Sequence, residues 1–165
     1  EKFIEKYYGK EGISVNGFEF LNQKNDSLPA VVTFKLSADL SGTGEYIYIP
    51  VNLFSGFEKN PFIANNRFSN VNFGYKRTII ASTSVSLPKN YLPDIIPKPV
   101  KMVTPGKDIV FTRNVFYDKE FNSVNVVFVF DFKKSIYTAD EYPVLKEVYQ
   151  KMFDFLKEPV VAKKK

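Results

Sequence analysis

Two pairs of carboxylates are the residues of this sequence that could do acid–base chemistry. Asp118 lies two residues before Glu120, and Asp140 is followed directly by Glu141. Two carboxylates flanking a bound sugar can act as acid and base of a glycoside hydrolase when their separation in space is right. The first pair, however, lies in a predicted hairpin loop, and the second lies at a predicted helix start, where exposed N–H groups favour acidic side chains. We therefore expect both pairs to be structural.

The chain contains no cysteine and no histidine. This composition excludes a thiol nucleophile, a disulfide and any catalytic arrangement of the Cys–His or Ser–His type on this chain. It also removes the usual side-chain ligands of zinc and haem. The sequence TPGKD at 104–108 contains glycine and lysine but lacks the spacing of a phosphate-binding loop. We expect no catalytic residue, no metal site and no cofactor, so the chain itself should not be an enzyme.

A stretch rich in asparagine and aromatic residues, NPFIANNRFSNVNFGYKRT at 60–78, allows two interpretations. In the first it is a connector, in which Asn65, Asn66 and Gly74 set the turn geometry. Its arginines would then bind backbone carbonyls or nearby carboxylates. The rings that would pin such a connector to the core are Phe62, Phe68 and Phe73.

In the second interpretation the same stretch is a binding site for a sugar or for another domain. Asparagine and tyrosine supply the adaptable contacts of recognition surfaces, and arginine adds a forked donor. The possible interaction surface consists of Asn60, Arg67, Asn72, Tyr75 and Arg77. The sequence does not place these five residues on one face, so both interpretations remain open.

Composition favours a β-rich domain. The chain has 165 residues, enough for one ordinary hydrophobic core, and its 17 phenylalanines and 10 tyrosines suit pleated, half-buried surfaces. The net charge of +5 does not indicate a nucleic-acid surface, because three of the lysines close the chain at 163–165 and the others are spread among carboxylates. The sequence also has no apolar run long enough to predict a transmembrane segment.

Alternating apolar residues predict about seven or eight strands. The first should begin at Ile13 and contain a bulge at Gly17, and the apolar run VNVVFVFDF at 124–132 predicts a strand covered on both faces, with a helix on one side. Prolines make 89–106 an extended segment rather than a helix. Together these strands predict a mainly β fold, an antiparallel two-layer β-sandwich that is Ig-like or related.

One amphipathic helix is predicted at about 140–157. Its apolar stripe is formed by Leu145, Val148, Tyr149, Met152 and Leu156. Thr138 and Glu141 have the spacing of a capping box, and Pro159 should end the helix. Residues 1–12 also have helical spacing and should be the end of a helix from an upstream neighbour, so we expect a single domain over 13–165.

Several of these motifs, in this order, resemble a known family: the C-terminal β domain, of unknown function, of exported bacterial multidomain proteins with a transglutaminase-like core. The resemblance covers most of the chain. Its closing segment departs from the family, which usually has an Ile, Val and Leu run before two lysines where this chain has EPVVAKKK. The matching residues are NPF at 60–62, Arg67, VNFGYKRT at 71–78, LPKNY at 87–91, PKPVK at 97–101, EYPVLKEVYQK at 141–151, Lys163 and Lys164.

The resemblance implies a context rather than an activity. A transglutaminase-like core works through Cys, His and an acidic residue, so any catalysis would reside upstream, and the family assigns no catalytic residue to this part. It also implies a periplasmic or cell-surface location, with the upstream domains of the same polypeptide as partners. We expect a non-catalytic accessory domain that packs on or positions the catalytic core and exposes an apolar patch. The alternative is a glycan- or protein-binding module at the cell surface.

Overall fold

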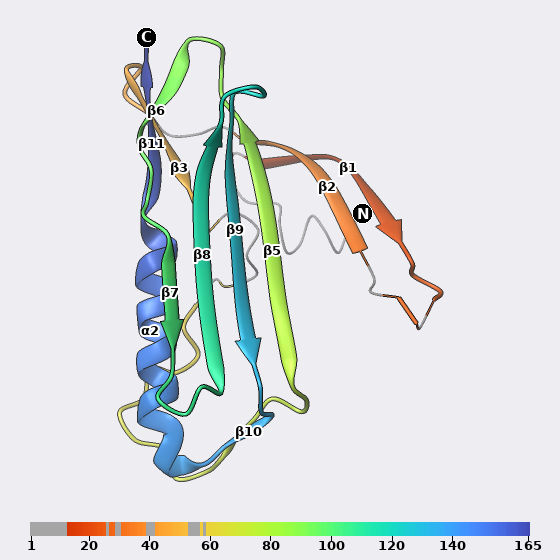
Figure 1. Ribbon diagram of the computed structural model, residues 1–165, viewed down its shortest axis with the longest axis vertical. Helices are drawn as coiled ribbons and strands as arrows, with labels where there is room; N and C mark the ends of the chain where they lie inside the picture. The colour runs from red at the N-terminus through yellow and green to blue at the C-terminus, as the bar shows by residue number, and fades with distance from the viewer. Residues whose placement is uncertain (1–12, 26, 29–30, 39–41, 53–56, 58) are drawn as a thin grey trace. The chain divides into compact units, whose positions relative to one another are not determined.

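The structure, a computed structural model, describes residues 13–165 except 26, 29–30, 39–41, 53–56 and 58 (Figure 1). The chain divides into two compact units, Glu1–Ser41 and Gly42–Lys165. The helix predicted for 1–12 lies outside the described residues. A single domain over 13–165 stays a prediction, because each unit is defined by itself.

The described part of the first unit is a two-stranded antiparallel sheet. Strand β1 (Ile13–Leu21) pairs with β2 (Val31–Ala38), and the register shifts between Val15 and Gly17. This shift confirms the bulge predicted at Gly17. Phe18 is 45% exposed and Phe20 is 46% exposed.

The strands of the second unit form two larger antiparallel sheets and one short strand pair. The four-stranded sheet has the order β5 (Arg77–Ser86), β9 (Ser123–Phe132), β8 (Ile109–Asp118) and β7 (Val100–Val103). The three-stranded sheet has the order β3 (Tyr46–Pro50), β11 (Pro159–Lys164) and β6 (Tyr91–Ile95). The short pair is β4 (Val71–Asn72) with β10 (Ile136–Tyr137).

The fold class is confirmed: the described residues form a mainly β, antiparallel structure with one C-terminal helix. They contain 11 strands rather than seven or eight. The difference includes β4 and β10, which are two residues long and have no alternation that a sequence pattern could detect. Helix α2 (Tyr142–Lys157) follows the 3-10 turn η1 (Ala139–Glu141), close to the predicted start.

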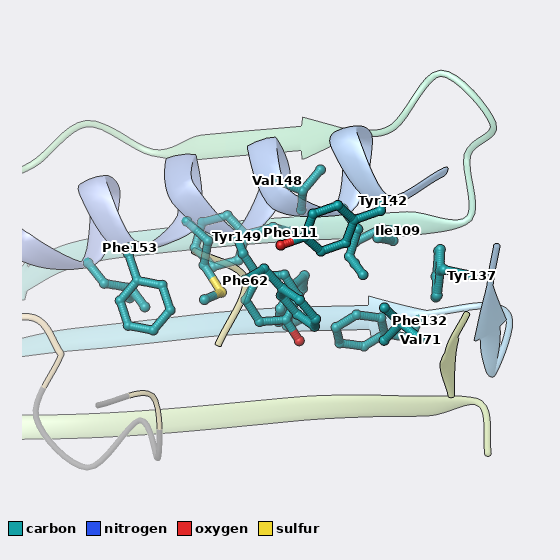
Figure 2. Packing of buried hydrophobic residues seen from close by; sticks show 14 of the residues in the cluster. Phe62, Val71, Ile109, Phe111, Phe132, Tyr137, Tyr142, Val148, Tyr149 and Phe153 are labelled. Atoms are coloured by element: carbon teal, nitrogen blue, oxygen red, sulfur yellow. The ribbon is translucent and has the colours of Figure 1, made fainter. Parts of the chain in front are cut away.

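The core of the second unit lies between α2 and one face of the four-stranded sheet. On β9 the inward side chains Phe128, Phe130 and Phe132 are almost completely buried, whereas the residues between them are half-buried. The predicted helix cover of this strand is therefore confirmed. Figure 2 shows Tyr149 of α2 and Phe132 of β9 in this cluster, and the Tyr149 ring lies 5.3 Å from the Phe130 ring between centroids.

The turn η1, which leads directly into helix α2, is capped by the residues the sequence suggested. Thr138 and Glu141 form the capping box, in which the Thr138 N–H donates to Glu141 Oε2 at 2.9 Å. The predicted apolar stripe is buried. After the helix, Val160 and Ala162 of β11 are completely buried, and β11 becomes the central strand of the three-stranded sheet.

An arginine on β8 connects the sheet to the end of the helix. The Arg113 side chain is 1% exposed and occupies an inward position of the strand. Its guanidinium donates to the Lys98 carbonyl at 2.9 Å, to Glu158 Oε2 at 2.8 Å and to the Phe155 carbonyl. Carbonyls in the last turn of a helix lack partners within the helix and carry partial negative charge, so Arg113 stabilises the C-terminal end of α2.

Candidate interaction site

The loop between β3 and β5 is fixed to helix α2 by side chains from both. Phe62 is buried in the core, and its ring lies 4.6 Å from the Tyr149 ring between centroids (Figure 2). The Tyr142 hydroxyl donates to the Ala64 carbonyl at 2.9 Å, and Lys146 Nζ donates to Asn65 Oδ1 at 3.0 Å. These contacts hold residues 60–65 in a defined position on the helix.

Two of the predicted site asparagines shape the loop. Asn60 Oδ1 accepts the Phe62 N–H at 2.9 Å, and Asn72 Oδ1 accepts the Gly74 N–H at 2.8 Å. Both are turns in which an asparagine side chain binds the backbone two residues ahead. Gly74 has a φ of 81°, a backbone conformation that glycine adopts without strain. The carbonyl oxygens of these two side chains therefore already have partners within the loop.

The two predicted site arginines have different environments. Arg67 is exposed, and its Nε donates to the Ser69 carbonyl at 3.1 Å, as expected for a connector. Arg77 lies at an inward, half-buried position of β5, with its guanidinium 4.7 Å from the Phe73 ring centroid and 5.1 Å from that of Phe132. Arg77 thus contributes to core packing by cation–π contacts.

Arg77 also affects a neighbouring tyrosine. Burial raises the pKa of Tyr149 to about 12, and the nearby Arg77 acts in the opposite direction. Within the described residues Arg77 Nε is buried and has no hydrogen-bond partner. Of the five predicted surface residues, those that are exposed are Arg67, Asn72 and Tyr75.

The loop presents large apolar side chains to solvent although it is held in place. Ile63 is 78% exposed, Phe68 is 97% exposed and Tyr75 is 67% exposed. Phe62 and Phe73 pack against the core as the connector interpretation predicted, but its prediction for Phe68 is wrong. The sequence could not separate these rings because Phe62, Phe68 and Phe73 follow no periodicity. We use the name apolar loop surface for Ile63, Phe68 and Tyr75.

A cleft of about 380 Å³ with both charged and apolar lining residues, which the sequence did not predict, lies near the start of α2. Lys134 Nζ lies 3.3 Å from Asp108 Oδ2, contacts Glu141 Oε1 and lies 4.6 Å from the Tyr137 ring centroid. Thr104 Oγ1 donates to Asp108 Oδ1 at 2.5 Å. These residues come from three separate segments, so no local sequence spacing signals the cluster.

The charges of this cleft satisfy one another. Burial alone would raise the pKa of Asp108, but hydrogen bonds from Thr104 and Lys134 outweigh it and lower the pKa. The hydrogen bond from Lys134 is the main cause of the lowered pKa of Glu141. Burial alone would lower the pKa of Lys134, whereas its bonds to both carboxylates raise it. All three groups are charged at neutral pH, which makes the cluster an ion-paired connection between the turn before β8, the segment after β9, and η1.

Replacing Lys134 with methionine should lower the free energy of unfolding at neutral pH by about 1–2 kcal/mol, because each partly exposed ion pair contributes up to about 1 kcal/mol. The ordinary pKa values are 3.8 for Asp108 and 4.5 for Glu141, and both are lowered in the folded protein. The two carboxylates therefore stabilise the fold at pH values above these ordinary values, and this contribution is lost as the pH falls through the lowered values. Urea unfolding of both proteins between about pH 6 and about pH 3 should therefore show a shrinking difference. A difference that stays constant would contradict this account.

Lys151→Met is the matched control for that experiment. Lys151 pairs with Glu147 on the exposed side of α2, at a distance of 2.6 Å. An exposed pair of this spacing contributes only about 0.3–0.5 kcal/mol. The control variant should therefore stay close to the unsubstituted protein throughout the pH range.

The carboxylate pairs singled out in the sequence have structural contacts. Asp118 Oδ1 accepts the N–H groups of Glu120 at 2.9 Å and Phe121 at 3.3 Å, which shapes the hairpin loop. Glu141 belongs to the capping box and to the Lys134 cluster. In the described part of the chain, no group of three or more Asp or Glu residues is placed to hold a metal ion, and no helix is long and apolar enough to cross a membrane.

The second unit is thus a mainly β, antiparallel domain whose best candidate site is the apolar loop surface. A family model described as a domain of unknown function with a solved structure (DUF3858) matches residues 45–162, most of this unit. The chain belongs to the DUF3858 family. No curated protein and no solved structure matches it significantly. The link to transglutaminase-like proteins therefore rests on the sequence resemblance alone.

Proposed function

We propose that this chain is a non-catalytic accessory domain of an exported protein with a transglutaminase-like core, and that it packs on or positions that core. The observation that carries the proposal is the apolar loop surface. Phe68 is 97% exposed on a loop that Phe62 fixes to the core. A fixed loop with exposed rings loses little conformational entropy on binding, and exposed aromatic residues favour a protein interface.

The polar groups of the chain support the non-catalytic part of the proposal. The Lys134 cluster holds its two carboxylates in the charged form, whereas a general acid needs a raised pKa. The chain also lacks Cys and His, so any thiol chemistry would belong to the upstream core. A periplasmic or cell-surface location follows from the same family context.

Calorimetric titration of the chain into the separately produced upstream core tests the proposal. We expect a saturable heat, and at least a tenfold weaker affinity for Phe68→Ala, because an interface aromatic that anchors binding contributes about 2 kcal/mol or more. Lys119→Ala is the control, since Lys119 lies in the exposed hairpin loop after β8. No heat with the core would contradict the accessory role.

The alternative function is a glycan- or protein-binding module. Tyr75 favours it, because a 67% exposed tyrosine beside the Gly74 bend can stack on a sugar ring and donate a hydrogen bond. A glycan screen with the unsubstituted chain and Tyr75→Phe would separate the two functions. Binding to a glycan, weakened in Tyr75→Phe and without binding to the core, would support the module instead.

A further inference from the structure

Strand β5 is an edge of the four-stranded sheet that lacks the usual protection against pairing. Among the described residues only β9 pairs with it (Figure 1). An edge strand offers a row of backbone N–H and C=O groups that can bind another strand, and proteins commonly block such edges with proline, charged residues or short strands. The length of β5 and its content of proline and charged residues therefore indicate whether this edge is blocked against pairing with another strand.

The other edge strands of the two larger sheets all carry a protective feature. Strand β3 ends in Pro50, β6 contains Pro93, and β7 is four residues long and contains Lys101. In contrast, β5 is ten residues long, and between Thr78 and Ser86 it contains neither a proline nor a charged residue. Among the edge strands of these two sheets in the described part of the chain, β5 is therefore the one without such a feature.

We infer that β5 pairs with β5 of a second copy of this chain, antiparallel and centred on Ile80. Such pairing is isologous, and it would join the two four-stranded sheets into one continuous sheet. In this register Ile80 faces Ile80 of the other copy, and Thr78 faces Ser82. Thr83 already has an interaction of its own, so the inferred ladder comprises only Thr78–Ser82.

The side chains of β5 fit this register on both faces. On the outer face Ile80 is 67% exposed, and pairing would cover it with the same apolar side chain. The flanking outer pairs join threonine to serine, which is a favourable cross-strand combination. On the inner face the half-buried Ile79 would lie opposite Ala81. The two copies of Arg77 would lie at opposite ends of the ladder, so the register brings no like charges together.

Site-specific cross-linking of the full chain tests the register. The sequence contains no cysteine, so each variant carries one thiol. Under a mild oxidant, Ile80→Cys should form covalent dimers at least about tenfold faster than Lys101→Cys on the protected β7, because directly opposed residues of antiparallel strands are within disulfide reach. A mixture of Thr78→Cys and Ser82→Cys should cross-link, whereas each of these variants alone should not.

Sedimentation equilibrium tests the association without a cross-link. We expect a concentration-dependent dimer, weakened at least about fivefold in Ile80→Lys because like charges would face each other across the ladder. Ser86→Lys, outside the ladder, should dimerise like the unsubstituted chain. A chain that is monomeric at every concentration, or an Ile80→Cys variant that cross-links no faster than Lys101→Cys, would overturn the inference. It does not rest on the proposed accessory function.

Discussion

Replacing Arg113 with methionine should lower the free energy of unfolding by about 2–3 kcal/mol, because hydrogen bonds to a charged group contribute about 1.5–3 kcal/mol. Methionine fills much of the volume but removes the donor of the Lys98 carbonyl, and it leaves the Phe155 carbonyl only the Glu158 N–H at 3.4 Å. Urea unfolding followed by circular dichroism gives the comparison.

Two further variants show which contact of Arg113 is responsible. Glu158 is 50% exposed and can bind water when its partner is lost, so Glu158→Gln should cost less than about 1 kcal/mol. Arg113→Lys keeps the charge but not the planar fork, and should be intermediate. A methionine variant as stable as the unsubstituted protein would show that the bonds to the helix end contribute little.

Phe62→Ala should also destabilise the protein by about 3–5 kcal/mol, the usual cost of deleting a buried ring. The Phe62 ring lies near those of Tyr149, Tyr142 and Phe73, with centroid distances of 4.6, 6.1 and 6.2 Å. The same deletion removes the side chain that fixes the apolar loop surface. Thermal and urea unfolding measure the first effect, and hydrogen exchange of residues 60–70 measures the second.

Phe68→Ala is the matched control, because it deletes the same side chain from the same loop at a position that is 97% exposed. Its unfolding free energy should change by less than about 0.5 kcal/mol. The pair therefore separates a residue that holds the loop from one that the loop presents. Equal losses of stability in the two variants would contradict the assignment of Phe62 as the anchor.

The sequence predicted the elements that have strong local patterns. The stripe from Leu145 to Leu156 marked the helix, and the apolar run at 124–132 marked a buried strand with a helix on one side. Both signals persist over many residues and are reinforced by caps or turns. The Gly17 bulge was also readable, because the alternation of apolar residues slips by one position there.

The parts that could not be predicted depend on contacts between distant segments. The Lys134 cluster joins residues 104, 108, 134 and 141, which share no motif. Arg113 carries a weak sequence signal, because it occupies the same inward face as Ile109 and Phe111, where a charged residue must have buried partners. The different positions of Phe62 and Phe68 follow from how the loop crosses α2, which residue types alone do not determine.

Hydrogen exchange of the chain, alone and with the upstream transglutaminase-like core, tests the central claim most directly. The claim is that the apolar loop surface is the contact to that core. We predict slower exchange of the backbone amides of residues 63–76 in the presence of the core, and little change in the hairpin loop at 118–122. Unchanged exchange at 63–76, with protection elsewhere or nowhere, would contradict the claim.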